Sequence, residues 1–209
     1  MNGEVVSFKQ RVCAAIIKGA ADYKSTFLDY EYLIYSEEFT EQKYYIISAL
    51  HTNFLHLTGV NTSLSTYDFF NKSFKGELTE DDFDFIKYGR DERSAKGSVR
   101  RKIKALSLMP SLLSNRLIAE ESFVKNTITC SFATTDNIIT VGFACDEGKD
   151  ARPKTLLVGS ELDKNKAVEV SLVLRREKDN AQFDTVIYGD PKQFSVNFSD
   201  LVASQVSVS

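Results

Sequence analysis

Apolar residues near the N-terminus recur at helical steps of three and four, at Val5, Phe8, Val12, Ile16, Ala20 and Tyr23. This spacing predicts an amphipathic helix over residues 5–23. Residues 27–35 then alternate between large apolar side chains and Asp29 or Glu31, which is the pattern of a β-strand. A polar turn follows and leads into a second apolar run at residues 44–49. The two runs predict a β-hairpin.

Capping patterns predict helices in the middle of the chain. Ser65 precedes aromatic residues at helical spacing, and Gly76 is placed to end that helix. Thr79 repeats the capping pattern and predicts a second short helix over residues 80–88. After a charged linker, a longer helix is expected from Ser98 onward.

From Phe123 onward the apolar pattern has a period of two. Candidate strands are residues 123–132, 138–144, 155–158, 168–174 and 183–188. The intervals between them are too short for crossover helices, which predicts a mostly antiparallel sheet packed on helices. The predicted fold class is therefore α+β. We expect an N-terminal helix in residues 1–26, a domain over residues 27–190, and an edge segment or tail in residues 191–209.

Composition places the chain in the ordinary soluble globular class, with 209 residues of which 43% are hydrophobic and 26% charged. Its three cysteines, Cys13, Cys130 and Cys145, are widely spaced and include no Cys-x-x-Cys pair, which favours reduced thiols in a cytoplasmic protein. No apolar run approaches the roughly 20 residues that a membrane-spanning helix needs. We therefore expect neither an export signal nor a membrane span.

Charge is distributed unevenly around a net value of -3, which argues against indiscriminate nucleic-acid binding. Residues 77–84 are acidic, and they read as a capped, solvated face because they lack the turn-forming spacing of a cation loop. Residues 87–104 are basic. Within them Arg100, Arg101 and Lys104 form either a solvated helix face or a surface that follows phosphates. No metal or other cofactor is expected.

Both histidines of the chain, His51 and His56, lie in one short stretch that stops at Gly59. We expect this stretch at or just beyond the second strand of the hairpin, where it could deliver side chains to one place. The alternative is a packed core, since its other residues are largely apolar. If the stretch is extended, His56 and Thr58 share a face, and Lys154 is their expected partner.

Several common catalytic motifs are missing, among them a Gly-rich phosphate loop, His-Glu-x-x-His and Gly-x-Ser-x-Gly. What remains is proton transfer by His51 or His56, and His56 is the expected acid or base. Cations would help, and Lys154, Arg175 and Arg176 are candidates beside the basic helix. Metal-independent RNA cleavage fits this set. It needs a base for the 2′-hydroxyl, an acid for the leaving oxygen and cations for the phosphorane.

Four stretches of the chain occur in a distinctive combination, namely Asn53-Phe54-Leu55-His56-Leu57-Thr58-Gly59, Phe69-Phe70, Gly76-Glu77-Leu78 with Asp82-Phe83, and Pro153-Lys154-Thr155-Leu156-Leu157. Over about residues 27–190 the chain resembles the fourth phage-associated family of the barnase, EndoU, colicin E5/D and RelE-like nucleases. The resemblance implies an α+β fold, helices followed by an antiparallel sheet, and metal-independent endoribonuclease activity in a protein of phage or mobile-element origin. Carried over by position, the matching polar residues are Asn53, His56, Thr58 and Lys154.

Two other function classes stay open. His56-Leu57-Thr58 also resembles the nicotinamide-ribose site of ADP-ribosyltransferase-like enzymes, which would require a late catalytic glutamate at Glu169 or Glu177. A non-catalytic partner-binding protein, such as a phage-encoded inhibitor, would use residues 77–84 or 87–104 as its contact face. The expected partners are therefore RNA and, for a toxin, a cognate protein inhibitor. A solvated, cationic cleft around His56 would favour the nuclease, and a dry core would favour the binding protein.

Overall fold

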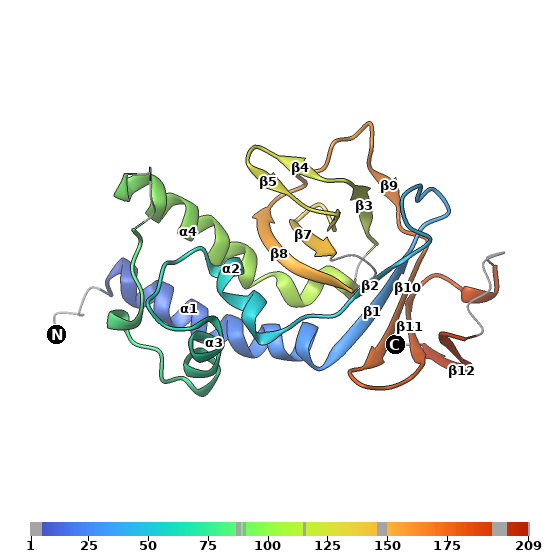
Figure 1. The fold of residues 1–209 in the computed structure, drawn as a ribbon, viewed down its shortest axis with the longest axis horizontal. Coiled ribbons are helices and arrows are strands. Elements are labelled where there is room, and N and C mark those ends of the chain that lie inside the picture. The colour runs from blue at the N-terminus through green and yellow to red at the C-terminus, as the bar shows by residue number, and fades with distance from the viewer. Residues whose placement is uncertain are drawn as a thin grey trace.

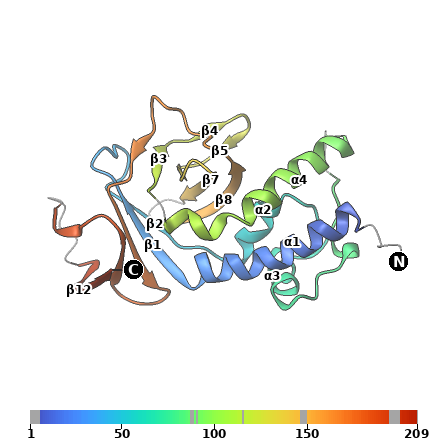
Figure 2. The ribbon, with the colours of Figure 1, turned by 180° about the vertical axis from the view of Figure 1, so that it is seen from behind.

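Helices gather on one side of the molecule and a curled sheet forms the other, as the two opposite views in Figures 1 and 2 show. The computed structural model describes residues 6–86, 89, 91–114, 116–145, 150–193 and 200–208. The arrangement confirms the predicted α+β class. Within the described residues, no helix has the length and apolar character needed to cross a membrane.

Helix α1 (Phe8–Tyr23) confirms the first predicted helix over the residues that the structure describes. The Ser7 hydroxyl caps it by accepting a hydrogen bond from the Gln10 amide at 3.0 Å. The apolar stripe from Val12 to Tyr23 is buried, as the spacing requires. The chain then continues into a π-helical turn, Lys24–Leu28, so the strand expected from residue 27 begins only at Tyr30.

Helix α3 (Thr66–Lys75) also follows its prediction, with Ser65 as the N-cap and Gly76 at a φ of 74° as the C-cap. The helix predicted over residues 80–88 is wrong for the part that is described. Only a 3-10 turn, Glu80–Asp82, forms there. Phe83 and Phe85 are instead both buried on an extended segment, and burial of these two rings outweighs the capping signal.

Helix α4 (Glu92–Leu106) begins earlier than predicted. Asp91, not Ser98, is its N-cap, and the Asp91 carboxylate accepts the Ser94 amide at 2.9 Å. A further 3-10 segment, Met109–Ser114, follows and contains Pro110. The predicted linker therefore supplies the first turns of the helix.

The histidine stretch is helical, which corrects the expectation of an extended chain. It consists of a 3-10 turn, His51–Asn53, and the short helix α2 (Phe54–Thr58), which ends at Gly59 with a φ of 76°. Residues i and i+2 of a helix point about 200° apart. His56 is therefore exposed while Thr58 is fully buried, and the prediction that they share a face is wrong.

The main sheet of the described chain has ten strands in the order β12-β11-β10-β1-β2-β8-β7-β6-β3-β9. Their bounds are β1 (Tyr30–Tyr35), β2 (Tyr45–Ile47), β3 (Ile118–Glu121), β6 (Phe132–Thr135), β7 (Ile139–Cys145), β8 (Ala151–Val158), β9 (Val168–Glu169), β10 (Leu172–Glu177), β11 (Phe183–Tyr188) and β12 (Val202–Val208). The predicted β1–β2 hairpin is confirmed. Most pairs are antiparallel, as predicted, while β2 with β8 and β11 with β12 are parallel.

Three parts of the sheet differ from the prediction, and one of them is the strand predicted over residues 168–174, which is divided into β9 and β10. Strand β3 was not predicted, and residues 123–132 contain a separate small hairpin of β4 (Val124–Lys125) and β5 (Ile128–Thr129) before β6 begins. Asn126 at the tip has a φ of 53°, a left-handed conformation that turns the chain. The period-two pattern of residues 123–132 therefore continues through a turn, which the pattern alone does not indicate.

The sheet curls until its edge strand β9 lies next to its middle. The chain passes directly from β9 to β10, and on the way the Ser171 amide donates to the Tyr35 carbonyl at 2.8 Å. Stacked rings fill the interior, with Tyr45 on Phe132 at 4.1 Å and Phe132 on Phe143 at 4.8 Å between centroids. The same core continues into the helices, so helices and sheet hold one another in place.

Candidate active site

The chain between β2 and α2 crosses the junction of the sheet and the helices. Three hydrogen bonds from other elements fix the residues just before His51, namely Ser48 Oγ to Glu31 Oε1 (2.6 Å), Lys178 Nζ to the Ala49 carbonyl (2.6 Å) and the Tyr23 hydroxyl to the Leu50 carbonyl (2.9 Å). These contacts come from α1, β1 and the end of β10. His51 is therefore held at a defined position although it is exposed.

The His51 imidazole lies against rings of α3 and within the electrostatic reach of two lysines. Its centroid is 4.9 Å from Phe70 and 5.9 Å from Tyr67, both edge to face. Partial burial, and then the positive charges of Lys178 and Lys24, lower the pKa of His51 below its usual 6.5. The imidazole is consequently neutral near pH 7 and able to accept a proton.

Arg152 on β8 adds a cation that the sequence reasoning missed. Its Nη1 atom is buried and has no hydrogen-bond partner in the described part of the chain. Its charge lowers the pKa of the Tyr23 hydroxyl, against the larger effect of burial, which raises it. The only sequence signal for Arg152 is the run Arg152-Pro153-Lys154, in which the family resemblance points to Lys154. A buried donor without a partner is a feature that an anion could satisfy.

The motif residues around His56 have mainly local contacts. The Asn53 side-chain oxygen accepts the Leu50 amide at 2.9 Å and closes the turn. The Thr58 hydroxyl donates to the Leu55 carbonyl at 2.8 Å and is buried. The His56 carbonyl accepts Lys102 Nζ at 2.9 Å. Asn53 and Thr58 therefore stabilise the turn and helix that carry both histidines.

Lys154 lies in different surroundings. It is exposed on β8, and its Nζ donates to the Thr129 carbonyl of β5 at 2.6 Å. It lines a cavity of 910 Å³ together with Tyr44, Cys130 and other residues, none of which comes from the histidine stretch. The expected pairing of His56 with Lys154 is not formed.

The predicted RNA-binding cations do not share one surface. Arg100 packs over the Phe8 ring at 5.1 Å, and Arg101 and Lys104 are exposed on α4. Arg175 lies over Tyr30 at 4.5 Å, whereas its neighbour Arg176 forms an ion pair with Glu31 at 2.6 Å. Adjacent strand residues point to opposite faces, so Arg175 and Arg176 cannot bind the same phosphate.

A family model described as phage-Barnase-EndoU-ColicinE5/D-RelE like nuclease4 (PBECR4) matches residues 15–192. The chain belongs to the PBECR4 family. The match runs from α1 past the end of β11 and so includes the histidine stretch and most of the curled sheet. Neither the curated proteins nor the solved structures contain a significant match. The description of the PBECR4 family indicates a nuclease, and hence a nucleic-acid substrate.

Other chemistries have less support in this PBECR4 structure. Among the residues that it describes, no group of three or more His, Cys, Asp or Glu side chains could hold a metal ion. Of the two glutamates considered for ADP-ribosyl transfer, Glu169 forms an exposed ion pair with Arg116, and Glu177 lies opposite Tyr30 at the end of β10. The three cysteines are free thiols.

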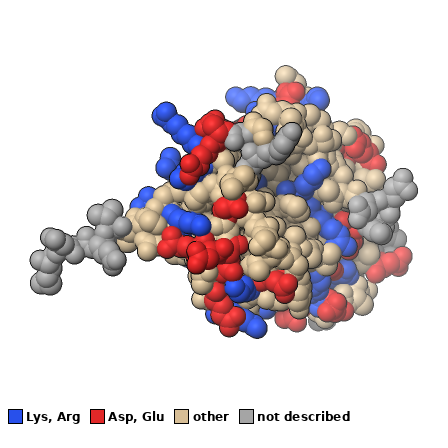
Figure 3. Space-filling model, turned by 60° about the vertical axis from the view of Figure 1, so that its left-hand side comes forward, with Lys and Arg blue, Asp and Glu red and all other residues tan. Residues whose placement is uncertain are grey.

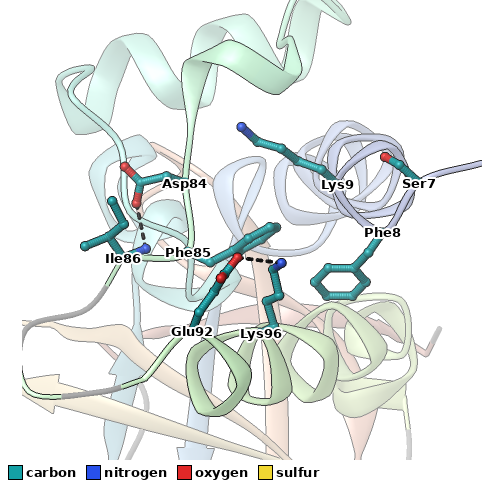
Figure 4. Close-up of a pocket in the computed structure, with 8 residues that line it drawn as sticks. All are labelled: Ser7, Phe8, Lys9, Asp84, Phe85, Ile86, Glu92 and Lys96. Atoms are coloured by element: carbon teal, nitrogen blue, oxygen red, sulfur yellow. Dashed lines mark hydrogen bonds and ion pairs between the residues drawn. The ribbon is translucent and has the colours of Figure 1, made fainter.

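A second cavity, of 700 Å³, lies between the start of α1, residues 84–86 and the start of α4 (Figure 4). Phe8, Phe85 and Ile86 supply its apolar wall, while Lys96 pairs with Glu92 at 2.6 Å across its edge. It contains no histidine. It lies where the acidic and basic stretches meet, which suits contact with a partner better than acid–base chemistry.

Charge on one face of the molecule is mixed. Figure 3 shows a group of acidic side chains left of centre and a band of Lys and Arg in the right-hand half. A face of this kind attracts a phosphate chain locally without making the whole protein basic. The net charge of -3 is therefore compatible with a nucleic-acid substrate.

Proposed function

We propose that this PBECR4 protein is a metal-independent endoribonuclease in which His51 is the general base. The observation that carries the proposal is the setting of His51, an imidazole on a fixed backbone whose pKa is lowered by partial burial and then by the charges of Lys178 and Lys24. A histidine of this kind combines access to substrate, a fixed position and the correct protonation state. We further propose that the protein acts in the cytoplasm and needs no cofactor.

The reaction follows from these groups. Neutral His51 accepts the proton of a 2′-hydroxyl, and the freed oxygen attacks the adjacent phosphorus. The bond from phosphorus to the 5′ oxygen breaks, and that oxygen leaves with a proton, which the ammonium group of Lys178 can supply. Lys24 and Lys178 offset the charge that develops on the phosphorane. The product is a 2′,3′-cyclic phosphate.

His56 is the alternative base, because it lies within the motif that resembles the family. Its support is weaker, because the long-range hydrogen bonds from α1, β1 and the end of β10 fix the residues just before His51 and not the helix that carries His56. In the proposed mechanism, Asn53 and Thr58 contribute by stabilising the local backbone. Arg152 is a candidate to contact the phosphate through its unsatisfied guanidinium.

The test is incubation of the purified protein with total RNA in EDTA. We expect cleavage to persist, products to end in a 2′,3′-cyclic phosphate or the 3′-phosphate formed from it, and a DNA copy to resist cleavage because it lacks the nucleophile. The His51→Ala variant serves as the inactive control. Loss of activity in EDTA, or equal cleavage of DNA, would contradict the mechanism.

The second candidate function is partner binding without catalysis. The 700 Å³ cavity between the acidic and basic stretches favours it, because an apolar hollow with charged edges suits a protein contact. Folded, monodisperse protein that cleaves no RNA under any tested condition would shift the conclusion to this function.

A further inference from the structure

Exposed apolar side chains are concentrated around His51. Tyr67 is 55% exposed, Phe74 45% and Leu50 41%, and all three belong to the turn that carries His51 or to α3 beside it. The other large exposed apolar residues of the described chain come from separate segments, namely Val6, Ile86, Val124, Ile138 and Val208. Exposed aromatic rings next to a proposed active site call for a ligand that covers them.

The rings are linked by a continuous row of ring contacts. Tyr67, Phe70 and Phe74 are spaced by three and four residues and so share one face of α3. The Phe70 and Phe74 rings are nearly parallel, at 7° and 5.9 Å, and the His51 ring lies against both Phe70 and Tyr67. We call Tyr67, Phe70 and Phe74 the aromatic platform. Phe70 is its buried support, and the other two rings are accessible.

We propose that Tyr67 and Phe74 bind unpaired bases on either side of the scissile phosphate, so that the substrate is single-stranded RNA. This inference rests on the proposed function, because it uses His51 as the point of cleavage. Every base has a flat π-face, and one base stacked on an aromatic side chain contributes about 1–3 kcal/mol to binding. Bases of a duplex are stacked on each other and are not free to occupy these rings.

The charges around the platform favour a polyanion with flat groups over an apolar protein segment. The charges of Lys178 and Lys24 reach His51, although Lys24 is also paired with Asp29. At the other end of α3, Lys75 directly follows Phe74 and forms no ion pair among the described residues. Bases would lie on the rings while their phosphates run past these lysines.

The test measures binding without cleavage. A fluorescent single-stranded 2′-O-methyl RNA, which has no free nucleophile, is titrated with the intact wild-type protein by anisotropy, alongside an abasic strand of the same length and a blunt duplex. We expect Tyr67→Ala and Phe74→Ala each to weaken binding of the base-containing strand by about 5- to 150-fold, the range for one stacked base. Binding of the abasic strand should not change.

Matched variants separate stacking from general damage. Tyr67→Phe keeps the ring and should retain affinity, and Val124→Ala and Ile138→Ala remove exposed apolar side chains elsewhere and should have no effect. Equal affinity for strand, abasic strand and duplex, or unchanged affinity in both alanine variants, would overturn the inference. If RNA is cleaved but the alanine variants bind normally, the platform fails and the nuclease stands. If base-dependent binding is lost in the variants while no RNA is ever cleaved, the platform stands and the nuclease fails.

Discussion

Residues 48–51 and residues 54–58 are close together in the chain, and each segment carries one histidine. Different forces hold the two segments in place. The first segment is fixed by polar contacts with α1, β1 and the end of β10, and His51 projects from it into solvent next to rings and cations. The second is a helix held by burial of Phe54 and Leu57, and His56 is on its exposed side.

The difference between the two segments shows what positions a reactive side chain. Apolar packing fixes α2 as a whole. Among the described residues, however, no side chain forms a hydrogen bond, ion pair or ring contact with the His56 ring. Long-range hydrogen bonds fix the backbone before His51 residue by residue, while partial burial, and then nearby charges, lower its pKa. The fixed position and the protonation state of its histidine therefore both favour the first segment as the site of the reaction. Different substitutions can disturb the position and the protonation state.

The largest expected effect comes from the ion pair under the first segment. Arg176 and Glu31 are 17% and 10% exposed at their side chains, and Glu31 also accepts the Ser48 hydroxyl. Arg176→Ala would leave a largely buried carboxylate unpaired, which costs about 3–5 kcal/mol in the free energy of unfolding. Urea denaturation measures it. Lys18→Ala, which breaks the exposed pair with Asp22, should change stability by less than about 1 kcal/mol.

Disturbing the second segment should affect stability and leave the chemistry intact. Leu57 is fully buried, so Leu57→Ala should lower the free energy of unfolding by about 2–5 kcal/mol. The kcat on RNA, measured well below the melting temperature, should stay within about two-fold of the wild type. A large loss of kcat at full folding would mean that α2 takes part in the reaction.

Sequence reasoning predicted local patterns better than tertiary contacts. The helix capped by Ser65, the β1–β2 hairpin and the mostly antiparallel sheet are confirmed because capping and periodicity are local signals. The histidine stretch was misjudged because five residues are too few to distinguish helix from strand by period. Lys178 could not be connected with His51, nor Arg152 with Tyr23, since each pair is separated by over 100 residues in the chain and comes together only through folding.

A smaller effect is expected from removing one anchor. Tyr23→Phe deletes the hydrogen bond to the Leu50 carbonyl and should cost about 1 kcal/mol of stability. Loss of this hydrogen bond should also lower kcat, because His51 directly follows Leu50 in the chain. Tyr32→Phe removes a similar bond, to the Thr26 carbonyl at 2.8 Å, and should cost similar stability with unchanged kcat. Equal kcat in both variants would show that the anchor does not position His51.

The smallest effect concerns pH. Because burial and the charges of Lys178 and Lys24 lower the pKa of His51, the acidic limb of the kcat/KM profile should lie below pH 6.5. Lys178→Gln removes one charge and should move that limb to higher pH, while the overall rate falls because Lys178 is also the proposed proton donor and anchors the Ala49 carbonyl. Stability should change in the same direction. Protonation of His51 destabilises the folded protein as the pH falls from 6.5 toward the lower pKa of the folded state. Lys178→Gln should reduce this loss of stability. An unmoved limb would exclude His51 as the titrating base.

The most direct measurement compares His51→Ala with His56→Ala in single-turnover cleavage of one RNA in EDTA. We expect the first variant to lose about two to four orders of magnitude in rate, the usual contribution of positioned proton transfer, and the second to stay within about three-fold of the wild type. Circular dichroism and melting temperature confirm that both are folded. Full activity in His51→Ala, together with loss of activity in His56→Ala, would contradict the assignment of His51 as the general base. It would place the reaction at His56 on helix α2.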